Sequence, residues 1–166
     1  MLAIAYQVRE TARSRSAEAL ARFRDYWESP INRVRRRRLA MALLDGMTVE
    51  TIPAAAIEDV VNFFEDLGAA LKEKHLNCYA TWSTFHDDAI HYWAAIGEVY
   101  ARECRDDEEY SQEYVEFGWM VKKLKAFERK KARRAAVVVD AQAVRDFLEV
   151  ESQLDQLITL NSGASI

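Results

Sequence analysis

The chain has 166 residues, half of them hydrophobic, with five glycines, two prolines and two cysteines. That length suits one domain, the hydrophobic content excludes a disordered chain, and so few turn residues argue against an all-β fold. The net charge of −4 hides three blocks of charge: ten arginines against four acids in residues 1–38, seventeen acids against four cations in 45–116, and eight cations against one acid in 122–134. The two cysteines lie in no metal-spaced pattern, so we expect reduced thiols in a reducing compartment.

The N-terminal segment, residues 1–28, is predicted to form one long helix. Its first eight residues are almost all apolar, and Arg9, Arg13 and Arg15 follow them. Eight residues cannot span a bilayer, which needs about twenty apolar residues. Two interpretations remain open: this segment is the end of a membrane-anchor helix with its cytoplasmic arginine flank, or it is a helix that packs on the domain.

A second helix is predicted to begin at Ser29 and Pro30, which are typical of a helix cap and a first helical turn. It extends to Leu44 and carries five arginines around most of its circumference. We therefore expect only a narrow buried stripe of Ile31, Val34 and Met41 or Leu44. The arginines, which we expect on the surface, are Arg33, Arg35, Arg36, Arg37 and Arg38.

Two amphipathic stretches, residues 57–71 and 79–100, are predicted to form the core. Their apolar residues recur at spacings of three and four, which places each set on one face of an α-helix. The short connection at 72–77 predicts an antiparallel hairpin. Gly68 is expected to permit the close approach of another helix. The predicted inward residues are Ile57, Val60, Val61, Phe64, Leu67, Leu71, Trp82, Phe85, Ala89, Trp93, Ile96 and Tyr100.

A fifth helix is predicted over residues 107–134, and Asp140 is expected to cap a sixth. Trp119 lies opposite the apolar stripe of the fifth helix, so we expect it either to be covered by the last helix or to mark a protein interface. Residues 161–166 are expected to fray. The sequence thus predicts one all-α domain over residues 1–160, a bundle of about six helices with the antiparallel hairpin at its centre.

Three polar residues flank the predicted core: Asn62, Glu65 and His86. One interpretation is a buried hydrogen-bond network that fixes the register of two helices. A catalytic interpretation would use Glu65 as base and His86 as acid, but no nucleophile motif or phosphate loop accompanies them. His86 and His91 fall on opposite faces of one helix, so we expect no metal site, no cofactor, a core-edge His86 and a solvated His91.

The two cationic runs, at 33–38 and 122–134, are candidate interaction surfaces. Three interpretations remain open: they bind nucleic acid through phosphates, they face anionic lipid headgroups, or they pair with the acidic middle of the chain. The overall acidity and the absence of a recognised motif argue against nucleic acid. In the second run the selected residues are Lys122, Lys123, Arg129 and Lys130.

Three passages carry a resemblance: residues 2–19, an apolar run that passes into an arginine-rich helix; residues 61–68, which read Val-Asn-Phe-Phe-Glu-Asp-Leu-Gly; and residues 85–93, from Phe85 to Tyr92 and Trp93. Together they resemble the bacterial helical family catalogued as domain of unknown function 4760, over about residues 2–128. The resemblance implies a helical domain on the cytoplasmic side of a membrane and often an N-terminal anchor. It supplies no catalytic residues. The chain departs from the pattern by lacking the upstream membrane helix, which leaves a shortened form and a soluble member both open.

These observations favour a non-enzymatic interaction or oligomerisation module, cytoplasmic or peripheral at the inner membrane. The expected partner is a second copy or another protein, with an anionic membrane surface next. Nucleic-acid binding is the alternative hypothesis, and a hydrolase or metal enzyme around Glu65 and His86 is the third.

Overall fold

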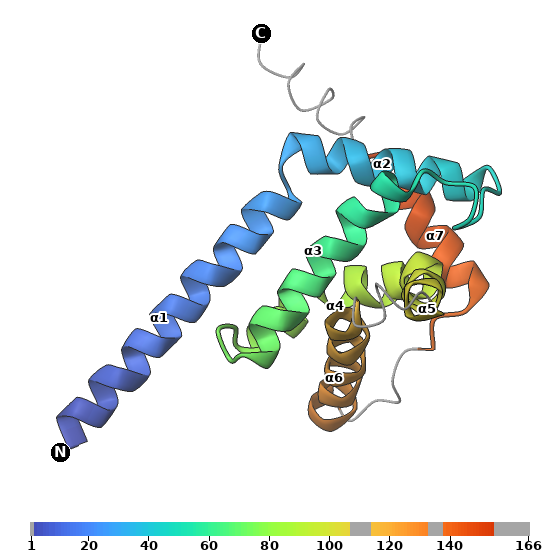
Figure 1. Cartoon of the computed structure of the whole chain (residues 1–166). Coiled ribbons are helices and arrows are strands. Elements are labelled where there is room, and N and C mark those ends of the chain that lie inside the picture. The colour runs from blue at the N-terminus through green and yellow to red at the C-terminus, as the bar shows by residue number, and fades with distance from the viewer. Residues whose placement is uncertain (1, 107–113, 133–137, 155–166) are drawn as a thin grey trace, which may run out of the picture.

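The computed structural model describes residues 2–106, 114–132 and 138–154, and the regular structure in these ranges is entirely helical (Figure 1). The predicted all-α bundle of about six helices is confirmed. The fourth predicted helix is one continuous helix in three parts, α4, η1 and α5. The elements are α1 (Leu2–Trp27), α2 (Pro30–Leu44), α3 (Ala54–Lys72), α4 (Cys78–Tyr92), η1 (Trp93–Gly97), α5 (Glu98–Asp106), α6 (Val115–Ala132) and α7 (Ala141–Glu151).

The core lies where α3, α4 and α6 meet. α3 and α4 form the predicted antiparallel hairpin, and α6 packs against both. Phe64 of α3 stacks on Phe117 of α6 with ring centroids 4.7 Å apart. Phe85 on α4 packs edge-on against Phe63 at 5.6 Å. The apolar period of α3 therefore predicts its buried face correctly: Ile57, Val60, Val61, Phe64 and Leu67 are each at most 1% exposed.

Gly68 lies where α3 and α6 cross closely. A Cβ at this position would lie 2.5 Å from the backbone oxygen of Glu116 and 2.8 Å from its carbonyl carbon. Only the hydrogen of a glycine fits against that peptide, so the predicted role of Gly68 in close helix packing is confirmed, with α6 as the partner.

The continuous helix formed by α4, η1 and α5 contains one π-helical segment, η1. In a π turn the backbone hydrogen bond joins residues five apart instead of four, so the turn adds one residue to the helix. Gly97 at its end faces Phe117, whose Cε1 would lie 2.8 Å from an added Cβ. The widened turn thus sits directly against α6, at the centre of the bundle.

The buried side of α4 is wider than the apolar period predicts. His91 is only 9% exposed, and its ring stacks on Phe147 of α7 with centroids 4.8 Å apart. Tyr92 is fully buried against the same phenylalanine. The prediction of a solvated His91 is wrong because α7 covers this second face of α4.

The buried side of α2 is partly polar and differs from the predicted one. Ile31 and Met41, predicted to face inward, are 58% and 45% exposed, whereas Asn32 and Arg36 are 5% and 3% exposed. Asn32 donates a hydrogen bond from Nδ2 to the Tyr26 carbonyl oxygen at 2.6 Å. The predicted stripe is wrong because the buried face of α2 carries Asn32 and Arg36 together with Leu39 and Ala40, instead of Ile31 and Met41.

The first half of α1 stands away from the bundle (Figure 1). The described side chains in residues 6–15 are all exposed, Tyr6 to 70%. Contact begins at Ser16, whose Oγ accepts a hydrogen bond from the Asn77 amide at 2.8 Å. From Ala19 onward the apolar side of α1 packs on the core. In the part of the chain that the structure describes, no helix combines the length and the apolar character that a membrane span requires.

Candidate interaction surfaces and a buried ionic network

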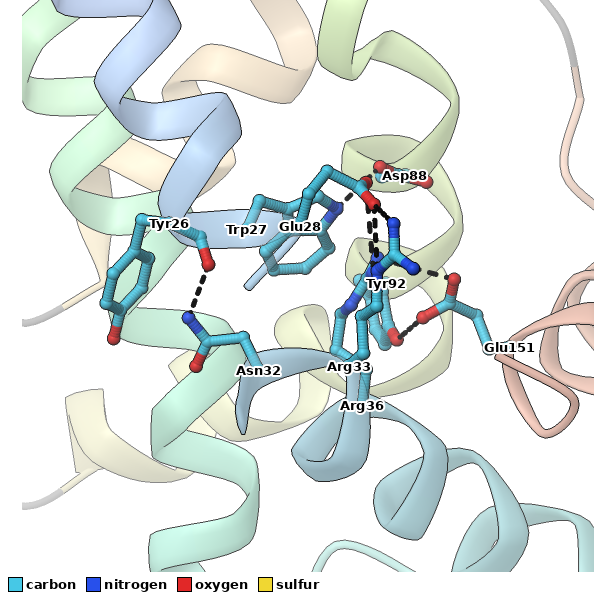
Figure 2. A network of polar contacts seen from close by, with 9 residues as sticks. All are labelled: Tyr26, Trp27, Glu28, Asn32, Arg33, Arg36, Asp88, Tyr92 and Glu151. Carbon is cyan, nitrogen blue, oxygen red and sulfur yellow. Dashed lines mark hydrogen bonds and ion pairs between the residues drawn. The ribbon is translucent and has the colours of Figure 1, made fainter. Parts of the chain in front are cut away.

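Arg36 lies at the centre of a buried network where α1, α2, α4 and α7 meet (Figure 2). Its guanidinium stands over the Trp27 ring, 4.2 Å from the centroid, and its Nη1 lies 3.4 Å from Oε1 of Glu151. Its Nη2 lies 3.9 Å from Oε1 of Glu28. The prediction that Arg36 belongs to an interaction surface is therefore wrong, because the side chain is almost wholly enclosed.

Two carboxyl groups of this network, those of Glu151 and Asp88, have further hydrogen-bond partners. The Tyr92 hydroxyl donates to Oε2 of Glu151 at 2.5 Å, and the indole nitrogen of Trp27 donates to Oδ2 of Asp88 at 2.9 Å. Burial, with the Glu151 carboxylate nearby, raises the pKa of Asp88 to about 7. Burial also raises the pKa of Glu151, while Arg36 and the tyrosine hydroxyl oppose the shift. Asp88 therefore keeps its proton below about pH 7.

The network fastens α7 to the bundle. Glu151 is one of two residues of α7 that are fully buried, with Leu148 as the other. On the next turn, Nε of Arg37 donates to the Ser152 carbonyl oxygen at 3.1 Å. These polar contacts hold α7 in place together with the apolar contacts of Phe147 and Leu148.

The other arginines of the 33–38 run are also engaged within the chain. Arg33 pairs with Glu28 at 2.6 Å, and Arg35 pairs with Asp59 of α3 at 3.1 Å. Arg38 is the exposed member. The alternative of pairing with the acidic middle of the chain is confirmed for Arg35 alone, because Arg33 pairs with Glu28 and Arg36 with Glu28 and Glu151, which lie outside that block.

Asn62, Glu65 and His86 do not form the predicted cluster. Glu65 accepts hydrogen bonds from the amides of Glu116 at 3.0 Å and Phe117 at 2.7 Å, so its carboxylate caps the first turn of α6. Burial raises the pKa of Glu65, and these two amides oppose the rise. His86 Nε2 lies instead 3.3 Å from Oε2 of Glu128 on α6, and Asn62 is exposed.

The expected cationic surface of α6 is present. Lys122, Lys123, Arg129 and Lys130 are exposed, and none of them makes an ion pair with another residue in the described ranges. Glu128 points inward to His86, so it leaves their charge uncompensated. Trp119 is partly buried and packs against the core.

A groove separates α1 from α3. Its volume is about 450 Å³, and Arg22, Phe23 and Tyr26 of α1 line one side. Asp59, Asn62, Phe63 and Asp66 of α3 line the other. The floor is aromatic, since Phe63 is packed edge-on by Phe23 at 5.9 Å and stacked by Tyr26 at 6.1 Å. The period of α3 predicts its carboxylates outside the core, but the sequence does not predict that α1 would face them across a groove.

Comparisons of the chain with protein-family models, with curated proteins and with solved structures found no match. The resemblance to the bacterial helical family remains a prediction.

Proposed function

We propose that the protein is a non-enzymatic helical interaction module that binds a helix of another protein in the α1–α3 groove. The observation that carries this proposal is the groove itself, which is open to solvent and has an aromatic floor. Tyr26 on its wall is 50% exposed, although its ring stacks on the buried Phe63. Apolar grooves between two helices bind amphipathic helices through residues spaced three and four apart.

The rim of the groove indicates the charge of the partner. Asp59, Asn62 and Asp66 follow one another along the same edge of α3 at intervals of three and four residues. Asp66 forms no ion pair with the described residues, while one oxygen of Asp59 is engaged by Arg35. An unpaired carboxylate and an exposed tyrosine ring that line the same groove favour a lysine or arginine, through Coulomb attraction and a cation–π contact. The expected partner is therefore an amphipathic helix with a cationic edge.

The contacts of the acid–base candidates support a binding role over a catalytic one. Both oxygens of Glu65 accept amide hydrogen bonds from α6, and His86 faces Glu128 on a different element. Neither Cys78 nor Cys104 is in a disulfide, as expected of a protein in a reducing compartment.

Photo-crosslinking tests this proposal directly. A benzoylphenylalanine replaces Asn62 in the groove, and a matched control replaces Gln142, which is exposed on α7. We expect position 62 to give a discrete adduct in cells and position 142 to give none. Loss of that adduct in Tyr26→Ala and Asp66→Asn variants would assign it to the groove. Equal labelling from both positions, or none from either, would contradict the proposal.

Light scattering after gel filtration separates the two kinds of partner. A concentration-dependent dimer that Tyr26→Ala dissociates would identify the bound helix as one from a second copy. A monomer at all concentrations, together with the adduct from position 62, would identify a different protein.

A further inference from the structure

We propose that one end of the bundle docks on an anionic lipid surface. This cationic end consists of the exposed face of α6, the first turn of α4 and the first half of α1. It is separate from the α1–α3 groove and does not depend on a partner occupying that groove.

The exposed face of α6 supplies the charge. At 100° per residue, Lys122, Lys125 and Arg129 lie along the middle and one side of this face, with Lys123 and Lys130 along the other. The buried face lies opposite, where Phe117, Met120, Val121 and Leu124 are at most 2% exposed. The helix is therefore divided lengthwise into a face for the core and a face of unpaired cations.

The start of α4 lies beside this cationic face. The Tyr79 ring is 59% exposed, and its centroid lies 6.2 Å from that of Phe127 on α6. Burial raises the pKa of the adjacent Cys78 thiol, and the nearby Lys123 ammonium opposes that rise. The first turn of α4 therefore places an exposed phenol next to α6, on the side of Phe127.

The first half of α1 reaches the same end. The Asn77 amide, which precedes α4, bonds to Ser16, and Ala12 to Ala17 face Leu76 and Ala80 across a shallow cleft. From there α1 continues outward into its apolar start at residues 2–6, beyond the end of the hairpin (Figure 1). Two acids of this region lie close to basic side chains, Glu10 at 3.9 Å from Arg13 and Glu73 at 3.5 Å from the His75 ring.

This combination fits a lipid surface better than a nucleic acid. Lysines and arginines on a helix face attract anionic headgroups, while a tyrosine and an apolar helix start partition into the boundary with the acyl chains. A nucleic acid would engage the cations but would leave the apolar start of α1 without a role.

Vesicle flotation tests this inference on the full chain. The probes are neutral phosphatidylcholine vesicles and vesicles that also contain phosphatidylserine, each at low and at moderate salt. We expect binding to the anionic vesicles alone, weakened by salt. The triple variant Lys122→Gln, Arg129→Gln, Lys130→Gln should lower the partition coefficient about 100-fold, or about five-fold per cation.

The matched control is Arg38→Gln, Arg102→Gln, Arg145→Gln, which removes the same charge from exposed positions on α2, α5 and α7. It should retain at least a tenth of wild-type partitioning. Tyr79→Ser should weaken binding without changing its salt dependence. Three outcomes would overturn the proposal: no wild-type binding at low salt, an equal loss in the control, or binding to duplex or single-stranded nucleic acid in place of vesicles.

Discussion

Replacing Gly68 with alanine should loosen the contact between α3 and α6. The new Cβ would lie 2.5 Å from the Glu116 oxygen, against about 3.4 Å for ordinary contact, so α6 must move by nearly 1 Å. A peptide group cannot rotate away as a side chain can, which puts the strain near the upper end of the 1–3 kcal/mol typical of overpacking. The higher helix propensity of alanine offsets about 1 kcal/mol of this strain. We expect a net loss of about 2 kcal/mol in the free energy of unfolding.

Urea unfolding followed by circular dichroism measures this loss, and thermal melts should show a fall in Tm of about 4–8 °C. The control is Gly118→Ala, whose Cβ would lie 2.7 Å from Cη2 of Trp93, the outer edge of a partly buried ring that can tilt. This variant should lose less than Gly68→Ala. A Gly68→Ala protein as stable as the wild type would refute the argument that a backbone contact sets the spacing of the two helices.

Three further predictions concern the polar contacts. Burial raises the pKa of Asp88 from 3.8 to about 7, so the folded protein keeps a proton that the unfolded chain releases, and the free energy of unfolding should fall as pH rises from about 4 to 7. Asp88→Asn keeps an acceptor for Trp27 and should remove this pH dependence. In urea titrations, the loss of stability between pH 4 and pH 8 should become smaller by up to about 4 kcal/mol. Arg36→Met leaves Glu151 without its countercharge and should cost about 3–5 kcal/mol, partly recovered by a second change, Glu151→Gln. Glu65→Ala should cost about 1–2 kcal/mol and speed hydrogen exchange at the first turn of α6, with Glu65→Gln milder; unchanged exchange would exclude the cap.

The apolar spacing of the sequence predicts the hairpin core and the start of the last helix. Ile57 and Phe64 recur at helical intervals, and local sequence is enough to place such residues on one face. Asp140 accepts a hydrogen bond from the Ala143 amide at 2.8 Å, as expected of a capping aspartate. These features are predictable because their causes lie within a few residues of one another.

The polar contacts depend on residues far away in the chain. Arg36 is buried because Glu151, 115 residues later, reaches it. Glu65 accepts hydrogen bonds from backbone amides 51 and 52 residues later. Because nearly every residue has a backbone amide, the sequence does not indicate which ones Glu65 contacts. A rule that places charged residues outside therefore fails for Arg36 of α2 and Glu128 of α6, while it succeeds for the exposed cations of α6, which pair with no acid among the described residues.

The π-helical turn at Trp93–Gly97 also bears on how this fold can change in length. Removing one residue from a regular α-helix rotates everything that follows by about 100° and exposes its buried face. Removing one from a π turn restores an ordinary α turn and keeps the faces before and after it aligned. Among the described helices, this turn is therefore the place where a homologue one residue shorter can retain the same core.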